Sequence, residues 1–197
     1  MTIQGSMLHR PAVLLAGLAA ATLMSACAPL LVGGAVVGTS MMVSDRRTSG
    51  AQLEDQAIEL KANTRVREAV GERGHVNTTS YNRIVLLTGE AATTEARDQV
   101  LSQVRAVNGV RRITNEIRIA DPSSFGNRSL DSLITSAVKS RFVVSKDLDP
   151  SRVKVVTEAS VVYLLGLVTH AEGDLAADRA ATIAGVARIV KVFEYID

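Results

Sequence analysis

The sequence predicts an α+β protein made of two tandem copies of one small αββαβ domain, in which two helices cover one face of a small sheet. The first observation is an internal repeat: the apolar run that ends at Gly89 recurs in the run that ends at Gly166, 77 residues later. A second landmark, the Gly-Val pair at Gly109, recurs at Gly185 after 76 residues. The third observation is that helical and strand periodicities alternate in the same order around both landmarks. Two landmarks at nearly the same spacing indicate a duplication.

Residues 1–26 are predicted to be a signal peptide. An apolar run from Ala12 to Met24 follows a basic residue. It is too short for a comfortable membrane span but has the length of a signal-peptide core. The run closes on Leu-Met-Ser-Ala before Cys27, the single cysteine, and this resembles the bacterial lipobox, in which the thiol receives a diacylglycerol. We therefore expect Cys27 to carry a lipid. The alternative is an ordinary cleaved signal, or an uncleaved anchor, with an uninvolved cysteine.

The stretch 27–50 is expected to be a lipidated N-terminus and a tether. Ala28 rather than Asp follows the cysteine, which in the lipoprotein pattern implies transport to the outer membrane. Because several acyl chains hold a protein stably on a membrane, we expect a lipid-anchored protein at the periplasmic face of the outer membrane. Arg46 and Arg47, near the end of the tether, are expected to lie close to anionic head groups.

The first domain is predicted to span residues 51–120. Helical spacing of apolar residues, glycines that stop a helix, β-branched runs and a threonine cap define its elements. In order they are a helix over 58–70, hairpin strands over 76–80 and 84–88, a helix from Thr93 or Thr94 to Gly109, and a strand over 112–119.

The second domain is predicted to span residues 129–197, after a turn-rich linker at 121–128 that should allow some relative motion. The same patterns recur in it in the same order. They give a helix over 130–138 with Ser129 as its cap, hairpin strands over 153–157 and 161–168, an alanine-rich helix over 176–184, and a strand over 186–196.

Enzyme, cofactor and nucleic-acid functions find little support in the composition. The net charge is +2, aromatic residues make up 3% and tryptophan is absent, so phosphate neutralisation and base stacking have no obvious platform. His75 and His170 have no cysteine or carboxylate partner at a catalytic or metal-binding spacing. The glycine-rich stretch 33–38 lacks the lysine of a phosphate loop. We expect no catalytic residue, metal, cofactor, small-molecule substrate or nucleic-acid partner.

The order of parts resembles that of BON-domain proteins. An apolar strand that runs into glycine, a helix rich in alanine and valine, and a Gly-Val pair before the last strand are similar to the BON domain over about residues 55–119 and 129–197. Two such units behind a lipobox are similar to outer-membrane lipoproteins with two BON domains. The resemblance implies binding of anionic phospholipid, chiefly phosphatidylglycerol, through the first helix of the second domain. It also implies a role in outer-membrane integrity and accumulation at division sites.

The candidate lipid-binding residues lie on and just after that helix. Apolar and basic side chains occur together there, as expected of an interfacial helix; they are Leu133, Val138, Lys139, Arg141, Phe142 and Val143, with Lys146 beyond them. The alternative is that Leu133, Val138 and Phe142 are core residues over the sheet. The alternative function is a periplasmic stress or scaffold lipoprotein that binds a protein partner, such as outer-membrane assembly machinery or a regulator of peptidoglycan hydrolases.

Overall fold

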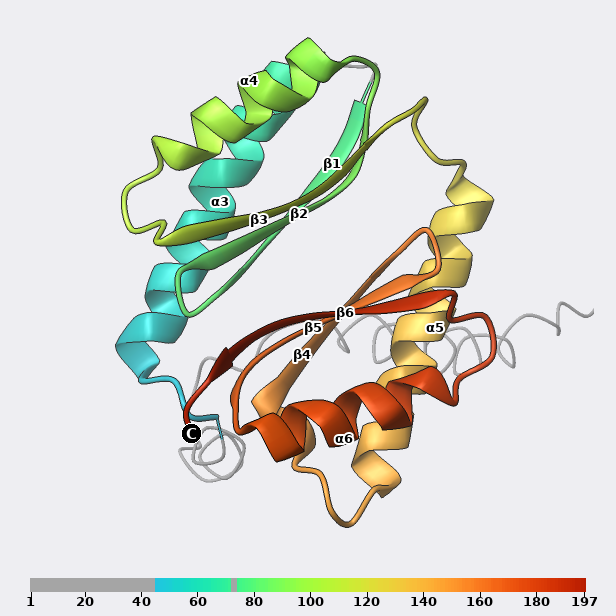
Figure 1. Ribbon diagram of the computed structural model, residues 1–197. Coiled ribbons are helices and arrows are strands. Elements are labelled where there is room, and N and C mark those ends of the chain that lie inside the picture. The colour runs from blue at the N-terminus through green and yellow to red at the C-terminus, as the bar shows by residue number, and fades with distance from the viewer. Residues whose placement is uncertain (1–44, 72–73) are drawn as a thin grey trace, which may run out of the picture. The chain divides into compact units, whose positions relative to one another are not determined.

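The structure is a computed structural model that describes residues 45–71 and 74–197. Within these ranges the chain forms two three-stranded sheets, each covered on one face by a pair of helices (Figure 1). We call residues 49–119 the first repeat and residues 125–195 the second repeat. Cys27, the predicted signal peptide and most of the predicted tether lie outside the described residues.

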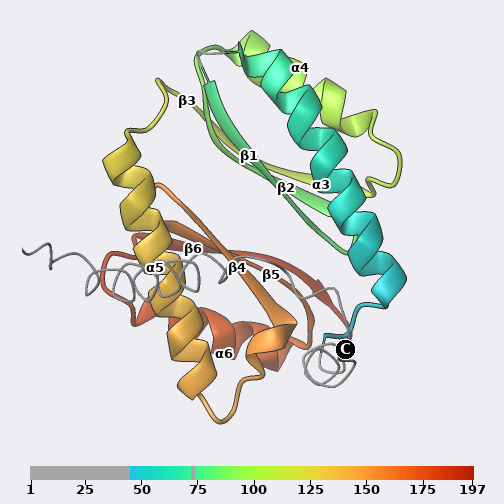
Figure 2. The ribbon, with the colours of Figure 1, turned by 180° about the vertical axis from the view of Figure 1, so that it is seen from behind.

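The first repeat has the predicted αββαβ order. Its elements are α3 (Ser49–Val70), β1 (Gly74–Tyr81), β2 (Ile84–Ala91), α4 (Thr94–Arg105) and β3 (Arg112–Ile119). The strand order is β1-β2-β3, with β1 antiparallel and β3 parallel to β2. A parallel neighbour needs a crossover connection, and α4 supplies it, lying beside α3 on the same face of the sheet (Figure 2).

The second repeat has the same order and topology. Its elements are α5 (Phe125–Val144), the short 3₁₀ helix η3 (Pro150–Arg152), β4 (Val153–Glu158), β5 (Val161–Val168), α6 (His170–Ala181) and β6 (Arg188–Tyr195). The α+β fold and the duplication are therefore confirmed.

Both opening helices begin earlier than the sequence patterns predicted. Thr48 caps α3 by accepting a hydrogen bond from the backbone N–H of Ala51, and Ser124 caps α5 through the N–H of Asn127. Hydroxyl caps of this kind replace the missing intrahelical partners of the first turn. As a result, α3 starts inside the expected tether and α5 occupies half of the expected linker.

A buried aspartate in the first helix of each repeat holds the hairpin turn. Asn82 and Arg83 have φ values of 48° and 67°, as a two-residue type I′ turn requires. The carboxylate of Asp55 accepts hydrogen bonds from both of their backbone N–H groups, at 2.7 and 2.8 Å. In the second repeat Asp131, 76 residues later, accepts both turn N–H groups of Ala159 and Ser160 at 2.8 Å.

The two glycines of the first landmark lie where the neighbouring backbone approaches too closely for a side chain. A Cβ atom at Gly89 would lie 2.0 Å from the carbonyl oxygen of His75, and one at Gly166 would lie 2.4 Å from that of Arg152. The second landmark has a different cause. Gly109 and Gly185 have φ values of 96° and 89°, which glycine adopts without strain.

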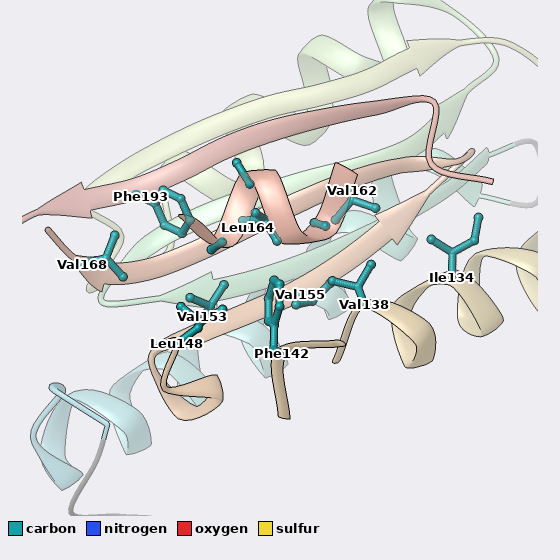
Figure 3. Close-up of a cluster of buried hydrophobic side chains, with 13 residues drawn as sticks. Ile134, Val138, Phe142, Leu148, Val153, Val155, Val162, Leu164, Val168 and Phe193 are labelled. Atoms are coloured by element: carbon teal, nitrogen blue, oxygen red, sulfur yellow. The ribbon is translucent and has the colours of Figure 1, made fainter. Parts of the chain in front are cut away.

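Each repeat has its own apolar core between helices and sheet. Figure 3 shows the second core, in which Val138 and Phe142 from α5 meet Val155, Leu164 and Phe193 from the sheet. The first core is built in the same way from α3, α4 and the inner face of β1–β3, with Ile58, Ala62, Val66, Val85, Leu87, Ala91, Val100, Val104, Val107 and Ile117.

A third apolar cluster joins the two repeats through the sheet faces that the helices leave uncovered. We call it the inter-repeat cluster; its buried members are Tyr81, Ile84 and Leu86 of the first repeat and Tyr163, Leu165 and Val192 of the second. Polar contacts accompany it: Asn77 donates to Glu158 at 2.9 Å, and Lys154 to Glu59 at 2.8 Å. Each sheet is therefore covered on both faces, and this packing opposes the relative motion expected from the linker.

Candidate functional site

Helix α5 carries the residues that sequence analysis selected. Its inward face is defined by Asp131, Ile134, Val138 and Phe142, which recur every three or four residues and are buried. This periodicity sets the orientation of the helix, so the side opposite these residues faces solvent.

The structure corrects two of the predicted lipid-binding residues. Val138 and Phe142 are 0% exposed and belong to the core of the second repeat, so they are not available to a membrane while the domain is folded. Leu133 and Val143 are 65% and 68% exposed. The alternative of a core role is thus correct for Val138 and Phe142 and wrong for Leu133.

Three further apolar residues on α5 were not selected from the sequence. Phe125, Leu130 and Val144 are all more than half exposed. The signal that could have identified them is the period of the buried residues, extended over the full helix. Phe125 was missed because the helix was expected to begin near Ser129.

Basic side chains flank the apolar ones at the C-terminal end of α5. Lys139 and Lys146 are exposed and Arg141 is half-buried. Among the described residues none of the three forms a salt bridge within 4.0 Å. Their charges are consequently available to an external anion.

The serines of the exposed face have their hydroxyl groups turned back onto the helix. Ser129, Ser132 and Ser136 each donate to the carbonyl oxygen four residues earlier, at 3.0, 3.0 and 2.9 Å. A hydroxyl that already donates a hydrogen bond costs less to remove from water. The face between the apolar residues is therefore less polar than its composition indicates.

The corresponding helix of the first repeat, α3, differs in charge. It also exposes two leucines, Leu53 and Leu60. Around Leu60 lie the exposed Lys61, Arg67 and Glu68, so positive and negative side chains are mixed. An anionic surface would attract some of these groups and repel others.

Arg46 and Arg47 are engaged by the protein, which corrects the expectation that they lie at head groups. Arg46 donates to the carboxylate of Glu172 at 2.6 Å and to the carbonyl oxygen of Leu167 at 3.0 Å. Arg47 pairs with Asp55 at 2.9 Å, and its guanidinium lies 3.8 Å from the ring centre of Tyr81. Residues 45–48 thus tie the start of α3 to the second repeat.

The described histidines lie near strand and helix ends. The ring of His170 stacks on Tyr195 with centroids 3.9 Å apart, and its Nδ1 lies 2.7 Å from the carboxylate of Asp197. His75 contacts the side-chain amide of Asn77. Within residues 45–71 and 74–197 no three metal-ligating side chains converge, and none of the helices there has the length and hydrophobicity of a membrane span.

The chain is similar to a known protein family and to individual known proteins. The BON domain family matches residues 55–121 and 130–197. Outer membrane lipoprotein DolP of Haemophilus influenzae is 35% identical over 91% of this chain and 94% of its own length. A 21 kDa hemolysin of Actinobacillus pleuropneumoniae is 34% identical over 77% of this chain and 79% of its own length.

Among solved structures, the C-terminal domain of CdsD, a structural protein of the type III secretion system of Chlamydia trachomatis, aligns with 68% of this chain and 96% of its own chain at 11% identity. Its TM-score of 0.30 is too low to establish a shared fold. The family match and the lipoprotein relative point to a non-catalytic family. The chain belongs to the BON-domain family, as an outer-membrane lipoprotein with two BON domains of the DolP type.

Proposed function

We propose that this lipoprotein binds anionic phospholipid, phosphatidylglycerol above all, through the exposed face of α5 in its second BON domain. In this proposal Cys27 anchors the chain at the periplasmic face of the outer membrane, and lipid binding by α5 maintains the integrity of that membrane, chiefly at division sites. The observation that carries the proposal is the pairing on α5 of exposed apolar side chains with basic side chains that lack salt bridges among the described residues.

The two kinds of side chain contribute different parts of the binding free energy. Each basic residue near an anionic surface is worth about 1 kcal/mol and is screened by salt. Burying a leucine or valine side chain adds about 1.5–3 kcal/mol. Leu133 and Val143 therefore supply the salt-resistant part of the interaction, and Lys139 and Arg141 supply the preference for negative charge.

Residues 45–197 can be tested without the lipid anchor. All three described apolar clusters, both sheets and the caps of both opening helices lie within this segment. The segment therefore contains the contacts that hold both repeats together, and circular dichroism should show it folded.

The test is binding to vesicles of phosphatidylcholine with and without phosphatidylglycerol. Wild-type 45–197 should sediment with the phosphatidylglycerol vesicles, and Leu133→Glu should lower the affinity about tenfold or more, since it replaces an inserting side chain with a repelled one. The matched control is Leu60→Glu on α3, because Leu60 is 71% exposed and occupies the first helix of the other repeat. It should bind like wild type.

Equal losses in both variants, or none in either, would contradict the assignment to α5. The alternative function, binding to a protein partner, predicts a different result. In that case Leu133→Glu would leave vesicle binding intact and would remove a cross-link to another envelope protein in cells. The intact mass of the mature chain tests the acyl group on Cys27, and a fluorescent fusion of the Leu133→Glu chain tests accumulation at division sites.

A further inference from the structure

A basic depression lies at the end of α5, next to the exposed Val143 and Val144. It has a volume of about 410 Å³ and combines the last turn of α5, the loop that follows it and the last turn of α6. Its lining residues are Arg141, Val144, Ser145, Lys146, Asp147 and Arg179. Three cations and one carboxylate therefore share one hollow.

The single carboxylate leaves most of this positive charge unbalanced. Arg179 donates a hydrogen bond to Asp147 at 2.8 Å. That hydrogen bond, with a smaller contribution from the charge of Arg141, lowers the pKa of Asp147 below its ordinary value. Asp147 is therefore ionised at neutral pH, and the lining retains an excess of positive charge.

Two arginines that line the depression have hydrogen-bonding capacity that the described residues do not use. The Nε atoms of Arg141 and Arg179 are shielded from solvent, and neither donates a hydrogen bond within the described part of the chain. A phosphate in the hollow would therefore reach them only when the guanidinium groups turn toward it. Guanidinium groups match the oxygens of a phosphate in geometry and charge, and hydrogen bonds between the two are among the strongest in proteins.

The helix ends account for only part of the arrangement. Arg141 and Arg179 lie in the last turns of α5 and α6, where the helix dipole favours a cation. The helix dipole does not explain why Lys146 lies in the connecting loop. It also does not explain why all three cations share one hollow beside an apolar surface.

We propose that this depression is a phosphate subsite, which holds the head-group phosphate of an anionic phospholipid while Val143 and Val144 contact the glycerol and acyl region. The proposal rests on the proposed lipid-binding function of α5 and assigns Arg179, on a different helix, to the same lipid. A site built from two helices would favour a phosphate head group over another head group of the same negative charge.

The variant that isolates the subsite is Arg179→Gln, because α6 carries none of the apolar residues assigned to the membrane. It should lower affinity for phosphatidylglycerol vesicles about fivefold. Affinity for vesicles given the same negative charge by oleate, a carboxylate, should change less. The matched control is Arg105→Gln, an exposed arginine in the last turn of α4, the corresponding helix of the first repeat. Asp147→Asn should act in the opposite direction and tighten binding, since it removes the competing carboxylate.

A spectroscopic measurement tests the contact itself. In a ¹H–¹⁵N correlation spectrum of 45–197, the Nε–Hε signals of Arg141 and Arg179 should move downfield on addition of phosphatidylglycerol micelles, while that of Arg105 stays in place. Inorganic phosphate serves as the second arm. Movement with both would show a general phosphate site, and movement with the micelles alone a site that also needs the apolar contacts.

The two proposals fail in different ways. If Leu133→Glu loses vesicle binding while Arg179→Gln and Asp147→Asn bind like wild type and the Nε–Hε signals do not move, the subsite is wrong and the lipid-binding face stands. If wild type binds no vesicles, the proposed function is wrong. Unchanged Nε–Hε signals with inorganic phosphate would then reject the subsite as well.

Discussion

At the scale of single residues, one carboxylate per repeat fixes how helix and hairpin meet. Asp55 and Asp131 are buried, yet each accepts two backbone hydrogen bonds from a turn whose residues have positive φ. Asp55 also accepts from the hydroxyl of Ser80 at 2.6 Å and pairs with Arg47. Hydrogen bonds offset the cost of burying a carboxylate, so in each repeat the aspartate serves to hold the turn against the helix.

Replacing either aspartate with asparagine should therefore destabilise the fold. The amide turns one acceptor into a donor that faces a backbone N–H, and hydrogen bonds to charged groups are worth about 1.5–3 kcal/mol. We expect a loss of that size in the free energy of unfolding for Asp131→Asn, and a larger one for Asp55→Asn because it has more partners. Urea unfolding of 45–197 measures both. Asp98→Asn, on an exposed carboxylate of α4, is the control, and a loss as large in the control would contradict the turn-holding role.

The residue scale is also where prediction of the site was least complete. Apolar and basic residue types selected α5 as the candidate helix, but they could not separate the exposed Leu133 from the buried Val138 and Phe142. Those three differ in which side of the helix they occupy, and that depends on the phase of the helix relative to the sheet. The phase was visible only once Asp131 and Ile134 were known to face inward. Arg179, which we assign to the proposed phosphate subsite, could not be selected from the sequence because α6 meets the end of α5 only in three dimensions.

At the scale of elements, residues 45–48 act as a strap between the repeats. Arg46 reaches the carboxylate of Glu172, the same group that closes the capping box of α6. The hydrogen bond from Arg46 lowers the pKa of Glu172 the most, and hydrogen bonds from the Thr169 backbone and Arg152 lower it further. Together they hold this pKa at about 2, although burial acts to raise it. A lowered carboxyl pKa means that the folded state favours the ionised form.

This lowered pKa gives the strap a pH dependence. The contribution of Glu172 to stability is complete above its ordinary pKa of 4.5 and is lost as the pH falls from there to about 2. Arg46→Gln should raise the pKa of Glu172 toward its ordinary value and make stability less sensitive to acid in that range. A carbon-detected NMR titration of the Glu172 carboxyl checks this. A pKa that stays at about 2 in the variant would show that Arg152 and the cap alone are responsible.

The elements themselves were largely predictable, because the hydrophobic periods, caps and glycines all follow local rules. The start of α5 was placed too late, since Ser124 and Ser129 are both acceptable caps and only the first is used. Strand β2 carried a signal that was not used. All eight of its residues are buried, and its first four residues, Ile84 to Leu87, form an unbroken apolar run, which is typical of a strand covered on both faces.

At the scale of the whole molecule, each sheet covers the helix-free face of the other through the inter-repeat cluster. Burial raises the pKa of Tyr81 and of Tyr163 to about 12, consistent with phenol groups held in this cluster. The turn-rich composition of 121–128 suggested independent domains, because a linker's sequence reports flexibility but carries no information about long-range packing. The interface depends on pairs of residues more than 70 positions apart.

The segment 45–197 should consequently unfold in one transition, with amide hydrogen exchange giving the same free energy in both repeats. Leu86→Ala removes a side chain from the inter-repeat cluster, and Leu87→Ala removes its neighbour from the first core. Both should cost about 2–5 kcal/mol. Only Leu86→Ala should let the repeats unfold at different denaturant concentrations. Two transitions in wild type, or release of two folded fragments by a protease that cuts at 121–124, would contradict the coupling.

The double burial of each sheet has a consequence for any chain that contains one repeat alone. Without the second repeat, the first repeat would expose Tyr81, Ile84 and Leu86 to water as an apolar surface on its sheet. Surfaces of that kind drive self-association. The nearest substitute for the missing cover is the same face of another copy, because the two repeats share one topology. A solitary repeat of this sequence is therefore expected to be a homodimer or an aggregate, and gene duplication converts that association between molecules into one within a single chain.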